Sequence, residues 1–205
     1  RGPSFPGAAR AFVAGVDDRA QQRVAGQMRR RAAESNPDYV LNAGDNFYWG
    51  GIQTLCGARP YAQVDTGQWG PIYEEVYRGP GLDGKQWLGV LGNHDYGGFT
   101  FSSGWDQVIG YTWGGPPPCT GRWMTPAQYW SARAEYPDFS VDYFFLDTNV
   151  FDAFDPHDNP DHNICSLQHT PNGASCGAQG PSSVWDCPAW FRRLWRDQTD
   201  WLQRR

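Results

Sequence analysis

The sequence has no apolar run long enough to cross a membrane, and it has no excess of positive charge. Its 17 Lys and Arg residues stand against 22 Asp and Glu residues, which gives a net charge of −5. A membrane span needs about 20 consecutive apolar residues. A negatively charged chain has no general attraction for nucleic acid or for an anionic membrane surface. We therefore expect neither a nucleic-acid partner nor a membrane partner.

No two of the five cysteines are spaced as C-x-x-C, and no N-x-S/T sequon is present. We therefore expect no zinc site built from cysteines, and glycosylation gives no support for secretion. Five cysteines are nevertheless many for a reducing compartment. Cys165, Cys176 and Cys187 lie in a loop rich in Gly, Ser and Pro, which has little core of its own and gains from a crosslink. We expect one or two disulfides and an oxidising compartment, with the pairing left open.

The sequence does contain an alternation of helix and strand patterns. Helix patterns begin near residues 17, 69 and 188, and strand patterns cover residues 38–43, 86–91 and 139–147. This alternation is typical of layered α/β proteins, and 205 residues are enough for one domain with a substantial core. Residues 96–136 predict no regular element, so we expect a long irregular loop there.

Two short strings follow apolar runs. Gly44-Asp45-Asn46-Phe47-Tyr48 comes after residues 39–41, and Gly92-Asn93-His94-Asp95 comes after residues 87–91. An apolar run that ends in Gly and then in ligand-type residues is typical of a buried strand that delivers its last side chains to a site. Asp, Tyr, Asn and His are side chains that a two-metal hydrolase would place there.

In the first string, Asp45 could bridge two cations with its two carboxylate oxygens. The alternative is an Asp that caps the following turn. Tyr48 is the more specific residue, because a phenol with an ordinary pKa of about 10 is a poor ligand for most metals near neutral pH. A strongly acidic trivalent cation such as Fe(III) can displace that proton. The alternative is a buried Tyr that packs beside Phe47.

In the second string, Asn93 offers a neutral carbonyl oxygen that suits a divalent ion already bound by a shared carboxylate. His94 would then lie beside the metals, where an imidazole could stabilise a phosphoryl oxygen or protonate a leaving alkoxide. The alternative is a turn in which the Asn and Asp side chains bond to local backbone. Together, the two strings at strand ends favour a metal site.

These strings resemble two signature motifs of the purple acid phosphatases, within the calcineurin-like metallophosphoesterases. Residues 122–126, 144–148 and 198–202 also resemble stretches of the animal-type branch of that family. The resemblance implies that Asp45 is the bridging carboxylate and Tyr48 the ligand of Fe(III). It also implies that Asn93 binds the divalent ion and that His94 contacts substrate without binding metal.

The same resemblance implies a function and a fold. The function is hydrolysis of phosphate monoesters or phosphoproteins by a metal-bound hydroxide, with Fe(III) and a divalent Fe, Zn or Mn ion as cofactors. A phosphodiesterase of the same superfamily is the alternative. The fold is a four-layer α/β/β/α sandwich. We expect a monomer that is secreted or lysosomal/vacuolar.

The site that the family implies needs four more ligands: an Asp in an Asp-x-Gly motif after an earlier strand, and three His after later strands. We find no counterpart for them, so we expect residues 1–205 to form a partial domain, truncated at both ends and inactive alone. A degenerate relative without activity is the alternative. A cluster of acidic and His residues follows the last strand pattern, but its charge pattern predicts a solvated loop. The cluster consists of Asp152, Asp155, His157, Asp158, Asp161 and His162.

Overall fold

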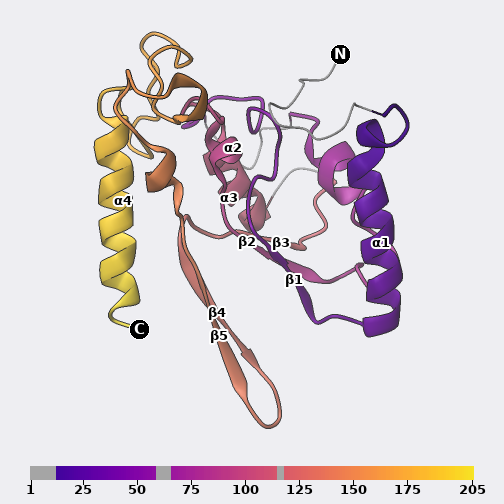
Figure 1. Ribbon diagram of the computed structural model, residues 1–205. Coiled ribbons are helices and arrows are strands. Elements are labelled where there is room, and N and C mark those ends of the chain that lie inside the picture. Colours follow the sequence, from indigo (N-terminus) through magenta and orange to yellow (C-terminus); the bar gives the residue numbers. More distant parts are fainter. Residues whose placement is uncertain (1–12, 59–65, 115–117) are drawn as a thin grey trace.

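The computed structural model describes residues 13–58, 66–114 and 118–205 (Figure 1). None of its helices is both long enough and apolar enough to span a bilayer within these ranges. The helices, including short 3-10 and π turns, are η1 Asp17–Arg19, α1 Ala20–Ser35, η3 Gly70–Glu74, α2 Asn93–Tyr96, α3 Trp105–Gly114, η4 Asn149–Asp152, η5 Pro160–His162 and α4 Cys187–Leu202. The strands are β1 Tyr39–Asn42, β2 Gln86–Gly89, β3 Trp123–Met124, β4 Trp130–Glu135 and β5 Ser140–Phe145.

The first three strands form a parallel sheet in the order β1-β2-β3. β1 pairs with β2 in a register that places Val40 opposite Trp87 and Asn42 opposite Gly89. Helix α1 runs beside this sheet and α4 lies on the opposite flank of the molecule (Figure 1). The mixed α/β architecture expected from the sequence is confirmed. Because β1 and β2 are parallel, the two strings that follow them emerge at the same edge of the sheet.

The long irregular loop predicted over residues 96–136 is wrong. In its described part, which leaves out residues 115–117, the chain forms α3, β3 and β4. Helix α3 is buried along most of its length, so it lacks the one-sided apolar stripe by which a sequence reveals a surface helix. Its aromatic, β-branched and Gly residues also have low helix propensity. Tertiary packing, rather than local preference, makes this segment helical.

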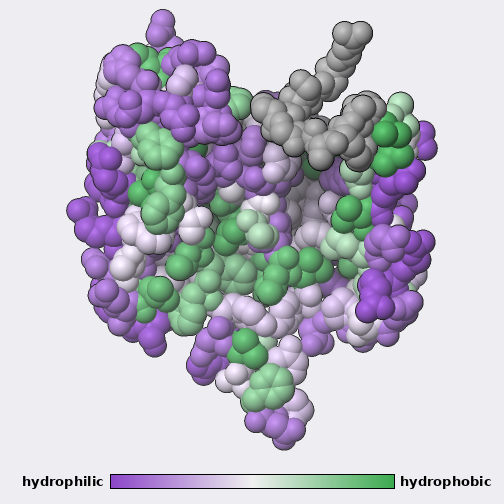
Figure 2. All heavy atoms as spheres, in the orientation of Figure 1, coloured by the Kyte–Doolittle hydropathy of each residue, from purple (hydrophilic) through white to green (hydrophobic). Residues whose placement is uncertain are grey.

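Strands β4 and β5 form an antiparallel hairpin that projects from the body (Figure 1). At its base the Trp130 ring stacks on Phe145 with 4.1 Å between centroids, and Trp130 Nε1 donates a hydrogen bond of 2.9 Å to the carbonyl of Gly89 at the end of β2. Figure 2 shows an apolar area over the sheet and the hairpin. Leu41 of β1 and Phe144 of β5 are exposed hydrophobic residues of these elements.

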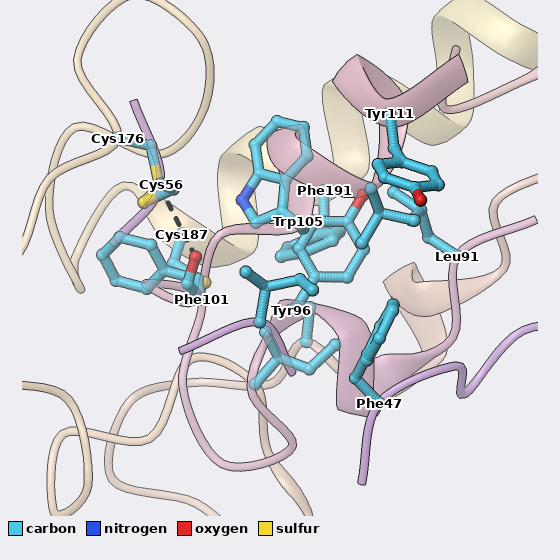
Figure 3. Packing of buried hydrophobic residues seen from close by; sticks show 14 of the residues in the cluster. Phe47, Cys56, Leu91, Tyr96, Phe101, Trp105, Tyr111, Cys176, Cys187 and Phe191 are labelled. Carbon is cyan, nitrogen blue, oxygen red and sulfur yellow. Dashed lines mark hydrogen bonds between the residues drawn. A yellow bond between two sulfur atoms is a disulfide. The ribbon is translucent and has the colours of Figure 1, made fainter. Parts of the chain in front are cut away.

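Two disulfides link the loops to the core, as expected from the cysteine content. Cys56 pairs with Cys176 across 120 residues, and Cys165 pairs with Cys187 across 22 residues, which leaves Cys119 as a free thiol. Cys56, Cys176 and Cys187 lie in one buried cluster with aromatic side chains (Figure 3). The same cluster includes Phe47, which belongs to the first string, and Leu91, which directly precedes the second. The buried core therefore holds both strings in place.

Candidate functional site

Groups from both strings converge on the carboxylate of Asp45. The hydroxyl of Tyr48 donates a hydrogen bond of 2.8 Å to Oδ2 of Asp45. The backbone N–H of His94, in the second string, donates to Oδ1 of the same carboxylate at 3.1 Å. The structure thus brings together three of the four residues that the sequence singles out, at the edge of the sheet where β1 and β2 end.

Glycines allow the two strings to touch backbone to backbone. Gly44 has φ +94°, and a Cβ on it would lie 2.7 Å from the backbone nitrogen of Gly92. A Cβ on Gly92 would lie 2.1 Å from Oδ1 of Asp45. Asp45 itself has φ +53°, a left-handed conformation that Asp tolerates better than most residues. A side chain at Gly44 would displace the backbone of Gly92, and a side chain at Gly92 would displace Asp45.

Asp95 ties the two strings together from inside, whereas the sequence predicted at most a bond from its side chain to local backbone. Its side chain is fully buried, with an exposed fraction of 0%. It accepts hydrogen bonds from the backbone and the side chain of Asn46 at 3.0 and 2.9 Å, and from the backbone of Gly92 at 2.8 Å. Burial raises the pKa of Asp95 to about 7, although these hydrogen bonds oppose the rise. The alternative of an acidic side chain that bonds to backbone thus holds for this residue.

The ring of His94 is held on two sides. Its Nδ1 lies 2.5 Å from the backbone carbonyl oxygen of Trp49. The ring of Tyr48 packs beside it with 4.4 Å between centroids, and the Trp49 ring meets it edge-on at 5.5 Å. Tyr48 and Trp49 are 56% and 45% exposed, so this aromatic group lies at the surface of the site.

Asn93 is the first residue of α2 and is half-buried. Its backbone carbonyl accepts a hydrogen bond of 2.9 Å from Gly98. Its side chain makes no hydrogen bond to any residue in the part of the chain that the structure describes. It sits beside His94 at the same sheet edge, and its role as a ligand stays a prediction.

A sequence model of the calcineurin-like phosphoesterases matches residues 18–201. The chain belongs to this family.

Individual relatives of this calcineurin-like phosphoesterase are purple acid phosphatases and tartrate-resistant acid phosphatases. Purple acid phosphatase 7 of Arabidopsis thaliana is 30% identical over 131 residues, which are 64% of this chain and 33% of that protein. Purple acid phosphatase 17 of the same plant is 36% identical over 78 residues, or 38% of this chain and 20% of that protein. Tartrate-resistant acid phosphatase type 5 of Sus scrofa is 29% identical over 113 residues, which are 54% of this chain and 28% of that protein. The matches span about a third or less of the relatives' own length.

The donors of this calcineurin-like phosphoesterase fit part of a metal centre. Asp45 and Tyr48 offer two oxygen atoms only 2.8 Å apart, the arrangement that a shared cation would require. Partial burial and the Asp45 carboxylate raise the pKa of Tyr48 to about 12. A cation of high charge next to the phenol opposes this rise, because it favours the phenolate. Within residues 13–58, 66–114 and 118–205, no three His, Cys, Asp or Glu side chains form a group that could hold a metal.

The acidic loop after β5 behaves as the charge pattern predicted. Asn163 holds its backbone by donating hydrogen bonds of 2.8 Å to the carbonyl oxygens of Asp155 and Asp158. Both of these Asp residues are exposed. Asp152, nearer to the strand, is half-buried, and its pKa is raised by burial and by the negative charge of Asp45. One carboxyl of this loop therefore lies within electrostatic reach of the calcineurin-like site, although sequence reasoning left the whole loop outside it.

Proposed function

We propose that this chain is the part of an acid phosphatase that carries Asp45, Tyr48 and Asn93 as metal ligands. The observation that supports this best is the Tyr48 hydroxyl on the Asp45 carboxylate at the end of β1. A phenol aimed at a carboxylate in this position suits a trivalent cation better than Mg or Ca, which prefer carboxylate, carbonyl and water oxygens.

In this proposal Fe(III) and a divalent Fe, Zn or Mn ion are the resident cofactors. Asp45 would bridge the two, Tyr48 would bind Fe(III), and Asn93 would bind the divalent ion. Such a pair of cations, when bound, neutralises the phosphate and makes water a nucleophile at neutral or acidic pH. His94 would contact the phosphate ester beside them.

The proposed substrates are small phosphate monoesters or phosphoproteins, as the resemblance to acid phosphatases suggests. A phosphodiesterase is the second candidate. The two disulfides support an oxidising location, so we propose that the protein is secreted or lysosomal/vacuolar and acts as a monomer.

Tyr48→Phe in the full-length product of the gene tests the iron assignment. We expect that product to show a visible absorption band from phenolate-to-iron charge transfer, and the substitution to abolish it. Tyr129→Phe is the matched control, because the Tyr129 hydroxyl makes no hydrogen bond to the described residues and its ring packs on Trp201. A colourless, iron-free protein that hydrolyses phosphate esters would refute the assignment.

The 205 residues alone provide a second test, of the ligand count. Only part of a binuclear centre is found among the described residues, so we expect negligible turnover of chromogenic phosphate monoesters and diesters even with added iron. Clear turnover would show that the chain holds a complete site. Full-length protein that prefers diesters would instead favour the second candidate.

A further inference from the structure

His94 is fixed to the first string at two points. Its backbone N–H donates to Oδ1 of Asp45 at 3.1 Å, and its ring nitrogen Nδ1 lies 2.5 Å from the Trp49 carbonyl oxygen. A carbonyl oxygen can only accept a hydrogen bond, so Nδ1 must carry the proton. Among the residues that the structure describes, Nε2 makes no hydrogen bond.

We propose that the Trp49 carbonyl is the positioning group of the site, because it holds His94 in the Nδ1–H tautomer and leaves Nε2 as the atom that faces the substrate. The bond made by one imidazole nitrogen decides which tautomer is present. The identity of that substrate as a phosphate ester rests on the proposed function. The tautomer does not.

The surroundings of this bond leave little freedom for the ring. Tyr48 covers one side of the imidazole at 4.4 Å between centroids. On another side is Gly98, whose φ is +76°. A Cβ there would lie 3.1 Å from Nδ1 of His94 and 3.3 Å from the Trp49 carbonyl oxygen. The absence of a side chain at Gly98 therefore leaves room for the hydrogen bond between His94 Nδ1 and the Trp49 carbonyl.

The tautomer fixes what Nε2 can do. With the proton on Nδ1, Nε2 carries a lone pair and accepts a hydrogen bond from a group that donates one. The ring does not have to turn to present this atom, because the Trp49 carbonyl already holds Nδ1–H.

Nitrogen-15 NMR of the 205-residue chain tests the tautomer without any metal or turnover. The chain has only four His residues, so the His94 signals can be assigned by their loss in His94→Gln. At a pH well above the ordinary imidazole pKa of about 6.5, we expect His94 to carry its proton on Nδ1. A proton on Nε2 of His94 in the unsubstituted chain would overturn the proposal, whatever the full-length protein catalyses.

Gly98→Ala tests the role of the Trp49 carbonyl. We expect it to change the His94 ring signals, because its Cβ crowds the bond. Gly84→Ala is the matched control: Gly84 has φ +73°, so alanine meets the same backbone strain, but a Cβ there has no neighbour within 4 Å. Unchanged His94 signals in a folded Gly98→Ala chain would refute the assignment of the partner. If that variant does not fold, the tautomer of the unsubstituted chain still decides.

In full-length protein, Gly98→Ala separates positioning from metal loss. A displacement of about 1 Å can cost roughly a hundredfold in rate. A Cβ at Gly98 moves its neighbours by only a few tenths of an ångström, so we expect kcat to fall about two- to tenfold. The visible iron band should be retained and KM little changed, and Gly84→Ala should leave all three unchanged. Loss of the iron band in Gly98→Ala would mean that the substitution also disturbs the metal site. That result would contradict an effect confined to the position of His94. Absence of that band from the unsubstituted protein would instead count against the proposed function.

Discussion

Replacing Gly92 by Ala tests how tightly the two strings fit. Gly92 has φ −97° and ψ 177°, a conformation that Ala adopts without strain. A Cβ there would nevertheless lie 2.1 Å from Oδ1 of Asp45 and 2.4 Å from its backbone nitrogen. Non-bonded carbon contacts are normally about 3.5–4.0 Å, so Asp45 must move by roughly 1 Å or more. Any effect therefore comes from packing and not from backbone conformation.

Overpacking of this kind costs about 1–3 kcal/mol. In a chain of this size each kcal/mol lowers Tm by roughly 2–4 °C, so Gly92→Ala should unfold about 2–12 °C below the unsubstituted chain. Gly50→Ala is the control, because a Cβ on Gly50, in the same part of the chain, has no neighbour within 4 Å. Thermal unfolding followed by tryptophan fluorescence measures both variants. Equal Tm values for the two would refute the close fit of the strings.

Three further perturbations test the scaffold. Burial raises the pKa of Asp147 to about 6. Protonated Asp147 therefore stabilises the fold fully below about pH 4, and roughly 3 kcal/mol of this stability is lost as the pH rises through about 6. In denaturant unfolding, the free energy of unfolding should change less with pH across this range in Asp147→Asn than in the unsubstituted chain. Replacing both Cys56 and Cys176 by Ser should lower the free energy of unfolding by roughly 5 kcal/mol, because the link closes 120 residues; a loss no larger than that from the shorter disulfide would contradict this. Glu74→Gln leaves the buried Arg122 guanidinium, 2.7 Å from the Glu74 carboxylate, without its charge partner. We expect a loss of about 3–5 kcal/mol by urea denaturation, and a loss below about 1 kcal/mol would mean that the pair is not buried as described.

The strands and strings of the site could be predicted because their information is local. Strands β1 and β2 are short and largely apolar, and the two strings of ligand-type residues begin at Gly44 and Gly92, within three residues of the strand ends. The convergence of Tyr48 and His94 on Asp45 then follows from the parallel pairing of the two strands. The presence of disulfides was equally readable from composition, whereas their pairing depends on how the loops pack.

The rest depends on contacts between distant residues or on the backbone. Helix α3 has no one-sided pattern because it is covered on nearly all sides. The buried pair of Glu74 and Arg122 joins charges 48 residues apart. The partner of His94 is the backbone carbonyl of Trp49, and every residue has such a carbonyl, so no residue type marks it in a sequence. Asp95 belongs to the second string, but its role in linking the two strings depends on its burial, which the sequence does not show.

The disulfide between Cys56 and Cys176 sets an order of events during synthesis. Cys56 follows the Trp49 segment closely in the chain, yet its partner is made 120 residues later. The loop that holds His94 therefore cannot be locked while the chain is still short, and it is locked only where thiols are oxidised. A chain that stays in a reducing compartment would keep this loop tied by packing alone. The site therefore reaches its locked form only after residue 176 has been made and both thiols have been oxidised.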